Sequence, residues 1–228
     1  MNPTYRKLLY ICLWYIVYPN VLLLLLAQDL FFKTENFIFL ATLLLTYGIG
    51  IIDTIIRPFS ESIQEDATIN PLYSLIMIVI FLLHPVIVAV SFYESKYLIS
   101  EYLPLWRNLF VSLFGIFILM VGGFITISGR YQLKNFGEGI LDIKEDHQLI
   151  TTGIYKYIRH QIYGGGIIGI IGFYCAFQSI VVLIIMINVY FFVFRHRLMF
   201  EEQLLIEAFG DQYKEYMKQT KCLIPFLY

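Results

Sequence analysis

The sequence predicts an all-α integral membrane protein, a polytopic helical bundle of four spans followed by a C-terminal transmembrane helical hairpin and an amphipathic cytoplasmic C-terminal helix. Three observations predict this class. Hydrophobic residues make up 59% of the 228 residues and charged residues 14%, whereas a soluble domain carries about 25% charged residues. The apolar residues gather in runs of roughly the ~20 residues that cross a bilayer. Lysine and arginine gather on one side of these runs.

Four apolar runs precede residue 129, and they cover residues 8–27, 37–56, 72–93 and 105–128. A fifth apolar region, 162–194, is too long for one span and short for two. Gln178 and Ser179 interrupt it near its middle, which predicts two short helical arms, 162–177 and 179–194. Helices are expected because unpaired backbone groups are costly in lipid. The runs also lack the alternation of barrel strands.

The positive charges predict the orientation. Of the 16 lysine and arginine residues, Lys33, Lys96 and Arg107 lie on one side of the proposed spans, and the other 13 lie on the opposite side. Cytoplasmic segments carry such an excess, so both termini are expected in the cytoplasm. A single fifth span would remove the asymmetry, so the charges also favour the hairpin. The first apolar run is too long for the core of a cleaved signal peptide.

The chain is expected to have two parts. Residues 1–129 form a four-helix transmembrane region, and residues 130–228 form a cofactor-binding and catalytic region. Two polar segments, 130–161 and 195–220, flank the hairpin, and the topology lets them meet on one side of the membrane. Apolar residues recur at helical spacing through the second segment up to Phe209. Gly210 is a candidate C-cap, and Asp211 begins a second short helix.

Several classes of function are disfavoured. A net charge of −1 without a basic run gives no reason to expect a nucleic-acid partner. Three cysteines without repeated spacing predict neither a disulfide framework nor a metal site.

The G-x-G-x-x-G at 164–169 lacks the preceding strand and the later acidic residue of a dinucleotide site. Such glycines let helices approach closely in lipid. A transporter would carry ionisable residues along a path through the membrane, and the candidates here are His84 and Asp53, the latter explained by a pair with Arg57.

Two clusters of polar residues adjoin the hairpin and are the candidate site. Tyr155, Arg159, His160 and Tyr163 lead directly into Gly164 and Gly166, whereas Arg197, Glu201 and Glu202 follow the hairpin. Arg197 and Glu201 are four residues apart, so they share one face of a helix. Each cluster alone is compatible with charges at the membrane boundary or a surface ion pair. Their placement beside one short hairpin favours a functional site.

At these residues the chain resembles the isoprenylcysteine carboxyl methyltransferases and their relatives, over about residues 149–226. The matching patterns are G-x-Y-x-x-x-R-H-x-x-Y-G at 153–164, R-x-x-x-E-E at 197–202, F-G-x-x-Y-x-x-Y at 209–216, and a proline at 225. Gln161 stands where the family has proline. The first four spans match only as generic membrane helices.

The resemblance implies S-adenosylmethionine bound at the cytoplasmic face and capped by the C-terminal helix. The implied cofactor residues are Tyr155, Arg159, His160, Tyr163, Gly164, Gly166 and Glu202. The implied acceptor is a lipophilic small molecule or prenylated peptide reached from membrane lipid, with the carboxylate of an isoprenylated cysteine first. A carboxylate is ionised at neutral pH and needs no general base. Arg197 would orient it, and Glu201 would hold Arg197.

Other functions stay open at this point. In phospholipid N-methylation, Glu201 could attract the amine or accept its proton, so the same two residues fit both acceptors. An NADPH-dependent reductase of isoprenoid or sterol double bonds has a similar hairpin, but no dedicated basic cluster for the 2′-phosphate is apparent. A transporter or structural protein ranks last. Substitution of Arg197 or Glu201 separates the classes, because an enzyme would lose turnover with its fold intact.

Overall fold

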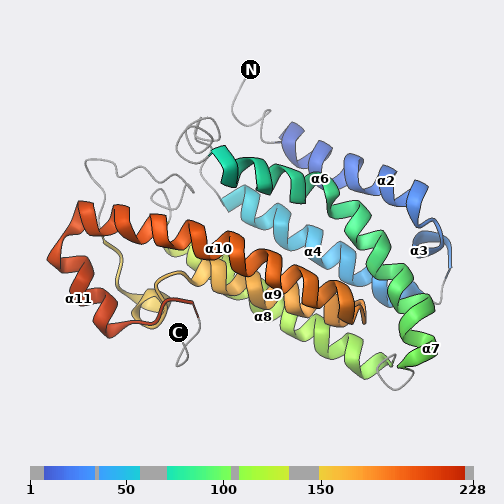
Figure 1. Cartoon of the computed structure of the whole chain (residues 1–228). Helices are drawn as coiled ribbons and strands as arrows, with labels where there is room; N and C mark the ends of the chain where they lie inside the picture. The colour runs from blue at the N-terminus through green and yellow to red at the C-terminus, as the bar shows by residue number, and fades with distance from the viewer. Residues whose placement is uncertain (1–7, 34–35, 57–70, 104–107, 134–148, 224–228) are drawn as a thin grey trace.

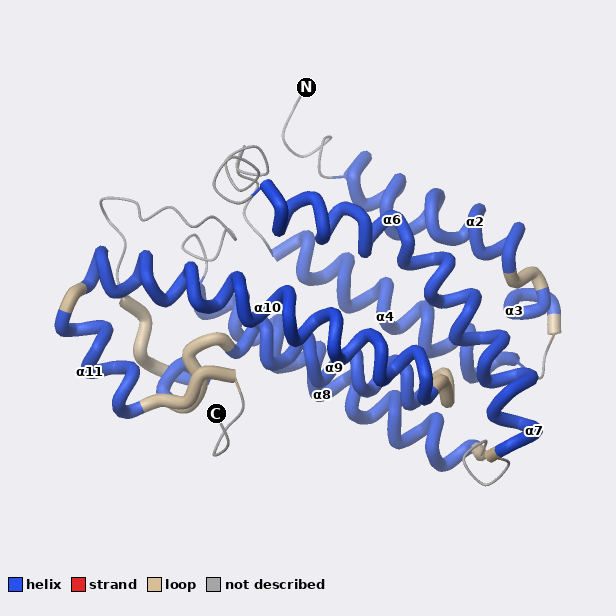
Figure 2. The backbone as a smooth tube through the Cα atoms, in the orientation of Figure 1, coloured by secondary structure: helices blue, strands red, loops and turns tan. Residues whose placement is uncertain are grey.

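The computed structural model describes residues 8–33, 36–56, 71–103, 108–133 and 149–223. These residues form a bundle of helices in which α8, α9 and α10 run side by side, with α2, α4 and α6 beside them (Figure 1). Figure 2 shows that most of the described residues are helical and that loops are few among them. The described residues contain no β-ladder beyond one isolated parallel bridge, between Ile158 and Lys221. The prediction of an all-α fold is confirmed.

The helices, including two π-helices and one 3-10 helix marked η, follow in this order: η1 (Cys12–Val17), α2 (Tyr18–Leu26), α3 (Asp29–Phe32), α4 (Phe37–Ile56), α6 (Pro71–Tyr93), η3 (Glu94–Ile99), α7 (Ser100–Tyr102), α8 (Leu109–Leu133), η5 (Gly153–Lys156), α9 (Gln161–Ala176), α10 (Ile180–Phe209) and α11 (Asp211–Gln219). Within the described residues, five helical stretches are long and apolar enough to cross a membrane, and they cover residues 8–26, 37–56, 78–102, 109–133 and 180–209. The shorter apolar helix α9 pairs with α10 as the predicted hairpin. The chain is an integral membrane protein.

Three elements differ in their bounds from those predicted. The fourth span, predicted at 105–128, is α8 and ends at Leu133. The third span continues past Tyr93 through η3 and α7 to Tyr102. The second arm of the hairpin continues through the polar segment as one helix of 30 residues, α10. No glycine or proline lies between Phe194 and Phe209, so nothing ends the helix before Gly210, whose φ is +56°. The candidate residues on α10 therefore lie on the same rigid element as its membrane arm.

The hairpin turn is buried, so its polar groups bind other parts of the protein. Gln178 has a φ of +55°, and its Nε2 donates to the Asn108 carbonyl at 2.8 Å and to Ser112 Oγ at 2.6 Å. Ser112 Oγ in turn donates to the Ala176 carbonyl at 3.0 Å. Gln178, one of the two polar residues that divide the apolar region, therefore fastens the turn to the start of α8.

Glu94, at the start of η3, caps the first turn of α10. Its carboxylate accepts hydrogen bonds from the backbone N–H of Val181 at 2.7 Å and of Val182 at 3.1 Å, and also from the Ser179 hydroxyl. A helix N-terminus has unsatisfied N–H groups and a positive dipole end, so a carboxylate stabilises it. The third span and the hairpin are joined by this contact.

Glycines hold α8 and α9 in backbone contact along their length. A Cβ placed on Gly122 would lie 2.6 Å from the Gly165 carbonyl oxygen, and one on Gly172 would lie 2.7 Å from the Gly115 carbonyl oxygen. Real side chains cannot approach so closely, so only glycine fits this seam. Among the glycines at 164–169, Gly165 and Gly169 take part in this close packing against Gly122, whereas a Cβ on Gly166 would meet no atom within 4 Å. The seam fixes the position of α9, whose first turn carries part of the candidate site.

Asp53 and Arg130 connect α4 with the end of α8. Arg130 is buried, and its Nε donates to Asp53 Oδ1 at 3.0 Å. Arg57, the expected partner of Asp53, lies outside the described residues.

The ring of His84 lies against those of Tyr47 and Phe173, with centroids 6.4 and 6.3 Å away.

Replacement of Gly172 by alanine tests the seam. Gly172→Ala should lower the free energy of unfolding by about 1–3 kcal/mol, because the methyl group forces α8 and α9 apart. The control is Gly48→Ala in α4, where a Cβ would meet no atom within 4 Å. Thermal unfolding in detergent micelles measures both variants. Equal stability of the two would contradict backbone contact at this seam.

Candidate functional site

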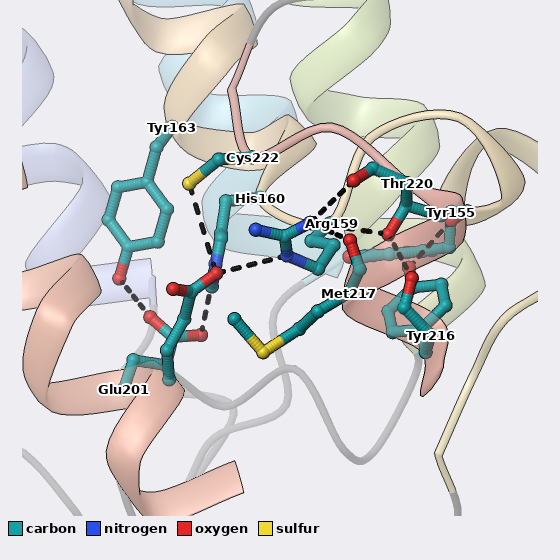
Figure 3. A network of polar contacts seen from close by, with 10 residues as sticks. Tyr155, Arg159, His160, Tyr163, Glu201, Tyr216, Met217, Thr220 and Cys222 are labelled. Atoms are coloured by element: carbon teal, nitrogen blue, oxygen red, sulfur yellow. Dashed lines mark hydrogen bonds and ion pairs between the residues drawn. The ribbon is translucent and has the colours of Figure 1, made fainter. Parts of the chain in front are cut away.

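The two polar segments meet at one end of the bundle. Residues 149–160 precede α9, and the far end of α10 and the whole of α11 close around them (Figure 1). Figure 3 shows the side chains of this region as one network of polar contacts. The expectation that the segments flanking the hairpin meet is confirmed.

Arg159 joins three segments. Its Nε donates to Glu202 Oε1 on α10 at 3.0 Å. Its Nη1 donates to the backbone carbonyls of Thr220 at 2.6 Å and Met217 at 3.1 Å, at the end of α11 (Figure 3). A cation beside the last carbonyls of a helix satisfies them and complements the helix dipole. Arg159 is therefore engaged in holding α11 against α10 and the loop before α9.

The backbone after α11 pairs with the same loop. Arg159 N–H donates to the Lys221 carbonyl at 2.8 Å, His160 N–H donates to the Cys222 carbonyl at 3.0 Å, and Lys221 N–H donates to the Tyr157 carbonyl at 3.1 Å. These bonds give the C-terminal segment 220–223 a fixed place beside the loop.

Tyr155 lies on the side of this unit that faces α8. Its carbonyl accepts a hydrogen bond from the Tyr216 hydroxyl at 2.6 Å, and its own hydroxyl donates to the Gly129 carbonyl at 3.4 Å. Burial raises the pKa of Tyr155, so the phenol stays protonated at neutral pH. In Figure 3 it lies on the opposite side of Arg159 from Glu201.

Tyr163 links Arg197 and Glu201. Arg197 is buried, and its Nε donates to the Tyr163 hydroxyl at 3.0 Å. That hydroxyl donates in turn to Glu201 Oε2 at 2.9 Å. Sequence spacing placed Arg197 and Glu201 on one helix face, and the structure adds a tyrosine from α9 between them. Tyr163 therefore contacts the two candidate catalytic residues.

His160 lies between the two glutamates. It is 4% exposed, with Nε2 3.3 Å from Glu202 Oε1 and Nδ1 3.8 Å from Glu201 Oε1. The network therefore runs from Arg159 through Glu202, His160 and Glu201 to Tyr163 and Arg197. Of the nine predicted site residues, six side chains lie in this network, whereas Tyr155, Gly164 and Gly166 lie elsewhere.

The two candidate cofactor glycines face different surroundings. A Cβ on Gly164 would lie 2.5 Å from the Leu223 carbonyl oxygen, so the C-terminal segment covers this position. A Cβ on Gly166 would meet no atom within 4 Å. Two residues along an α-helix correspond to a rotation of about 200°. The two glycines therefore point to opposite sides of α9, and their contact with a cofactor stays a prediction.

Gln161 is the first residue of α9, where the family has proline. This is the helix position at which proline is tolerated best, so the glutamine leaves the start of the helix unchanged. Its side chain is fully buried against α8, where a Cβ on Gly129 would lie 2.8 Å from Gln161 Nε2. Gln161 and Gly129 thus fill one space between the helices.

One group of side chains has the composition of a metal site. Ligand atoms of His160, Glu202 and Cys222 lie within 4.8 Å of one another. Metal binding requires the thiolate, but burial and the charge of Glu202 raise the pKa of Cys222 to about 11. Arg159 already supplies a positive charge to the same oxygen of Glu202. The cluster is better described as an ion-paired network, and the expectation of no metal site stays a prediction.

Sequence reasoning missed three residues of this region, Tyr213, Thr220 and Cys222. Tyr213 belongs to the F-G-x-x-Y-x-x-Y pattern, so the sequence could have predicted that it lies at the site. Thr220 and Cys222 belong to no pattern in the sequence, because their place depends on the chain turning back after α11.

Known proteins with similar sequences match the part of the chain that contains this site. The sequence model of a family described as phospholipid methyltransferase matches residues 110–212. Protein-S-isoprenylcysteine O-methyltransferase of Schizosaccharomyces pombe is 35% identical over 111 residues, which cover 48% of this chain and 47% of the relative. Protein-S-isoprenylcysteine O-methyltransferase A of Arabidopsis thaliana is 30% identical over 123 residues, which cover 53% and 62%.

A solved structure shows the same fold. It is a eukaryotic intramembrane Ras methyltransferase, an isoprenylcysteine carboxyl methyltransferase, with a TM-score of 0.65 and 20% sequence identity. The likeness covers 93% of this chain and 75% of that one. This chain is thus similar to isoprenylcysteine carboxyl methyltransferases in sequence over about half its length, and similar to one of them in fold. The chain spans about half the length of its Schizosaccharomyces pombe relative.

Removal of Arg159 tests its role in holding α11 in place. Arg159→Ala should lower the free energy of unfolding by about 3 kcal/mol, because Glu202 and two carbonyls at the end of α11 lose their partner. Hydrogen exchange of the α11 amides should rise. Lys218→Ala is the control, since its pair with Glu215 is exposed, and it should leave unfolding unchanged. Protection of α11 equal to that of wild type in Arg159→Ala would contradict the assigned role.

Proposed function

We propose that this protein transfers a methyl group from S-adenosylmethionine to the carboxylate of an isoprenylated cysteine. The observation that carries the proposal is the buried Arg197 guanidinium, held by Tyr163 next to Glu201. Beside it lies an apolar cluster of Val193, Phe194 and Leu198. A fixed cation next to apolar side chains suits an acceptor with an anionic head and a hydrocarbon tail. The names of the relatives support the same acceptor.

The chain's own part in the reaction is to bind and to orient. The acceptor carboxylate is ionised at neutral pH, so no residue needs to remove a proton. The planar guanidinium of Arg197 can hold a carboxylate through two parallel hydrogen bonds. Tyr163 fixes Arg197, and the Phe194 ring packs edge-on against Tyr163 with centroids 5.2 Å apart. Such positioning, away from water, supplies much of the rate of a two-substrate reaction.

The residues of the network fit the methyl donor. When bound, S-adenosylmethionine supplies an electrophilic methyl group on a positively charged sulfonium. Glu201 and Glu202 provide negative charge for its sulfonium and ammonium groups, and the tyrosine rings provide faces that attract cations. Arg159 serves this site by holding α11 in place, since its Nε and Nη1 bind Glu202, Met217 and Thr220.

Phospholipid N-methylation is the second candidate, because the matching family model carries that description. Glu201 would then attract the amine. Arg197 weighs against this acceptor, since a buried guanidinium disfavours a second positive charge nearby.

An NADPH-dependent reductase is less well supported than either methyltransferase. Arg159, which could otherwise bind a 2′-phosphate, already donates to Glu202 and to the Met217 and Thr220 carbonyls.

Transfer of labelled methyl groups in detergent micelles tests the acceptor. N-acetyl-S-farnesylcysteine should be methylated, whereas phosphatidylethanolamine should not be, because Arg197 selects the carboxylate. Arg197→Lys and Glu201→Gln should each lower turnover by about 10²-fold, the loss expected when one preorganised polar contact is removed. Lys214→Ala, on the exposed face of α11, is the matched control and should keep full turnover.

Calorimetry separates the remaining outcomes. If the folded wild-type protein does not bind S-adenosylmethionine, the methyltransferase proposal fails, and binding of NADPH would replace it with the reductase. Methylation of phosphatidylethanolamine alone would instead replace the proposed acceptor.

We also propose that both termini are cytoplasmic, which places the site at that face. The support is the placement of 13 of the 16 positive residues on one side of the spans. Single cysteines at Lys218 and Lys33, both exposed, can be introduced after the native cysteines are changed to serine. An impermeant maleimide should label Lys33→Cys only from outside sealed cells and Lys218→Cys only in inverted vesicles. The reverse pattern would invert the topology.

A further inference from the structure

Tyr213 is a buried residue whose hydroxyl has no hydrogen-bond partner among the described residues. It lies on α11 and is 1% exposed. Its hydroxyl oxygen is buried and makes no hydrogen bond to any described residue. Tyr216, one turn later on the same helix, is also buried, but its hydroxyl donates to the Tyr155 carbonyl at 2.6 Å. The two tyrosines share one face of α11 and differ in whether the hydroxyl has a partner.

An unpaired buried hydroxyl destabilises the folded protein. Leaving such a group without a hydrogen bond typically costs about 1–3 kcal/mol. Phenylalanine would give the same packing without this cost. Native proteins pair most buried polar groups, and an exception calls for a reason. A partner that the ligand-free protein lacks is one such reason.

The surroundings of Tyr213 indicate the charge of that partner. Burial is the main cause that raises the pKa of the Tyr213 hydroxyl. The negative charges of Glu202 and Glu201 raise this pKa further, whereas the positive charge of Arg159 lowers it. Met217 lies one turn after Tyr213 on α11, and its carbonyl accepts from the same Arg159 guanidinium that donates to Glu202. Arg159 donates to Glu202 and the end of α11, and the Tyr163 hydroxyl donates to Glu201. The nearby carboxylates thus already have donors, whereas Tyr213 has neither a donor nor an acceptor.

Other buried polar atoms also lack partners, but their surroundings differ. They belong to Tyr47, Ser95, Gln161 and Gln178. Tyr47 and Ser95 lie on the spans, Gln178 lies in the hairpin turn, and Gln161 faces α8. Of these five residues, Tyr213 is the one on α11, the helix whose end Arg159 joins to Glu202.

We propose that the Tyr213 hydroxyl contacts the methyl donor, accepting a hydrogen bond from the ammonium group of its amino-acid portion, an inference that rests on the proposed function. A cationic N–H donor matches a hydroxyl acceptor placed beside two carboxylates. Gly210, with its φ of +56°, turns the chain between α10 and α11, and Arg159 joins the end of α11 back to Glu202. Arg159 and Tyr216 fasten the far end of α11 and so keep Tyr213 in place.

Two ligands and two variants test this contact. S-adenosylhomocysteine carries the ammonium group, and methylthioadenosine lacks the amino-acid portion. By calorimetry, Tyr213→Phe should weaken binding of S-adenosylhomocysteine about tenfold, the effect of one hydrogen bond to a charged group. Binding of methylthioadenosine should not change. Thermal unfolding of ligand-free Tyr213→Phe should equal or exceed that of wild type, whereas Tyr216→Phe should unfold at a lower temperature.

Each other outcome has a definite meaning. If wild type binds S-adenosylhomocysteine and Tyr213→Phe binds it equally well, the inference fails and the proposed function stands. An equal loss of affinity for both ligands would remove the ammonium from the proposal. A stability loss like that of Tyr216→Phe would show that the hydroxyl has a structural partner. If the folded wild type binds neither ligand, the proposed function and this inference fail together.

Discussion

The ion pair between Arg159 and Glu202 is the contact on which the arrangement of the site depends. It joins the loop before α9 to the end of α10, and the same guanidinium satisfies the last carbonyls of α11. A buried ion pair is costly to desolvate and stabilises only where its remaining groups are bonded. Here both partners meet that condition, since Glu202 also lies beside His160 and Cys222. Three segments far apart in the sequence are thereby fixed around one network.

The membrane part of the fold makes this network possible. The glycine seam holds α9 directly against α8, and Glu94 and Ser112 fasten the hairpin turn at the other end. In lipid, hydrophobic burial does little to drive helices together, so close packing and internal hydrogen bonds do this work. The hairpin is consequently a rigid support, and α10 carries its charged residues out of the apolar region without a break. The site is thus positioned by helices rather than by loops.

In the proposed function, the network divides its residues by task. Arg197, Tyr163 and Glu201 lie next to the apolar cluster around Phe194, which is where a lipophilic acceptor would place its head group. Glu202, His160 and Tyr213 lie toward α11, which is where a polar donor would be enclosed. The two adjacent glutamates on α10 face these two sides, since one accepts from Tyr163 and the other from Arg159. A transfer reaction between an apolar and a polar partner requires such a boundary.

The sequence by itself determined the class, the spans, the hairpin and the two segments that meet, because hydropathy and charge asymmetry act over ~20 residues and need no knowledge of packing. It also placed Arg197 and Glu201 on one face through helical periodicity. The tertiary structure alone decided that Tyr163 bridges them, that Arg159 serves α11, and that Cys222 and Tyr213 join the site. Those contacts depend on where the chain turns back after Gly210 and on how close the glycines bring α8 and α9. Distances of this kind arise from packing between distant segments, and no local pattern of residues contains them.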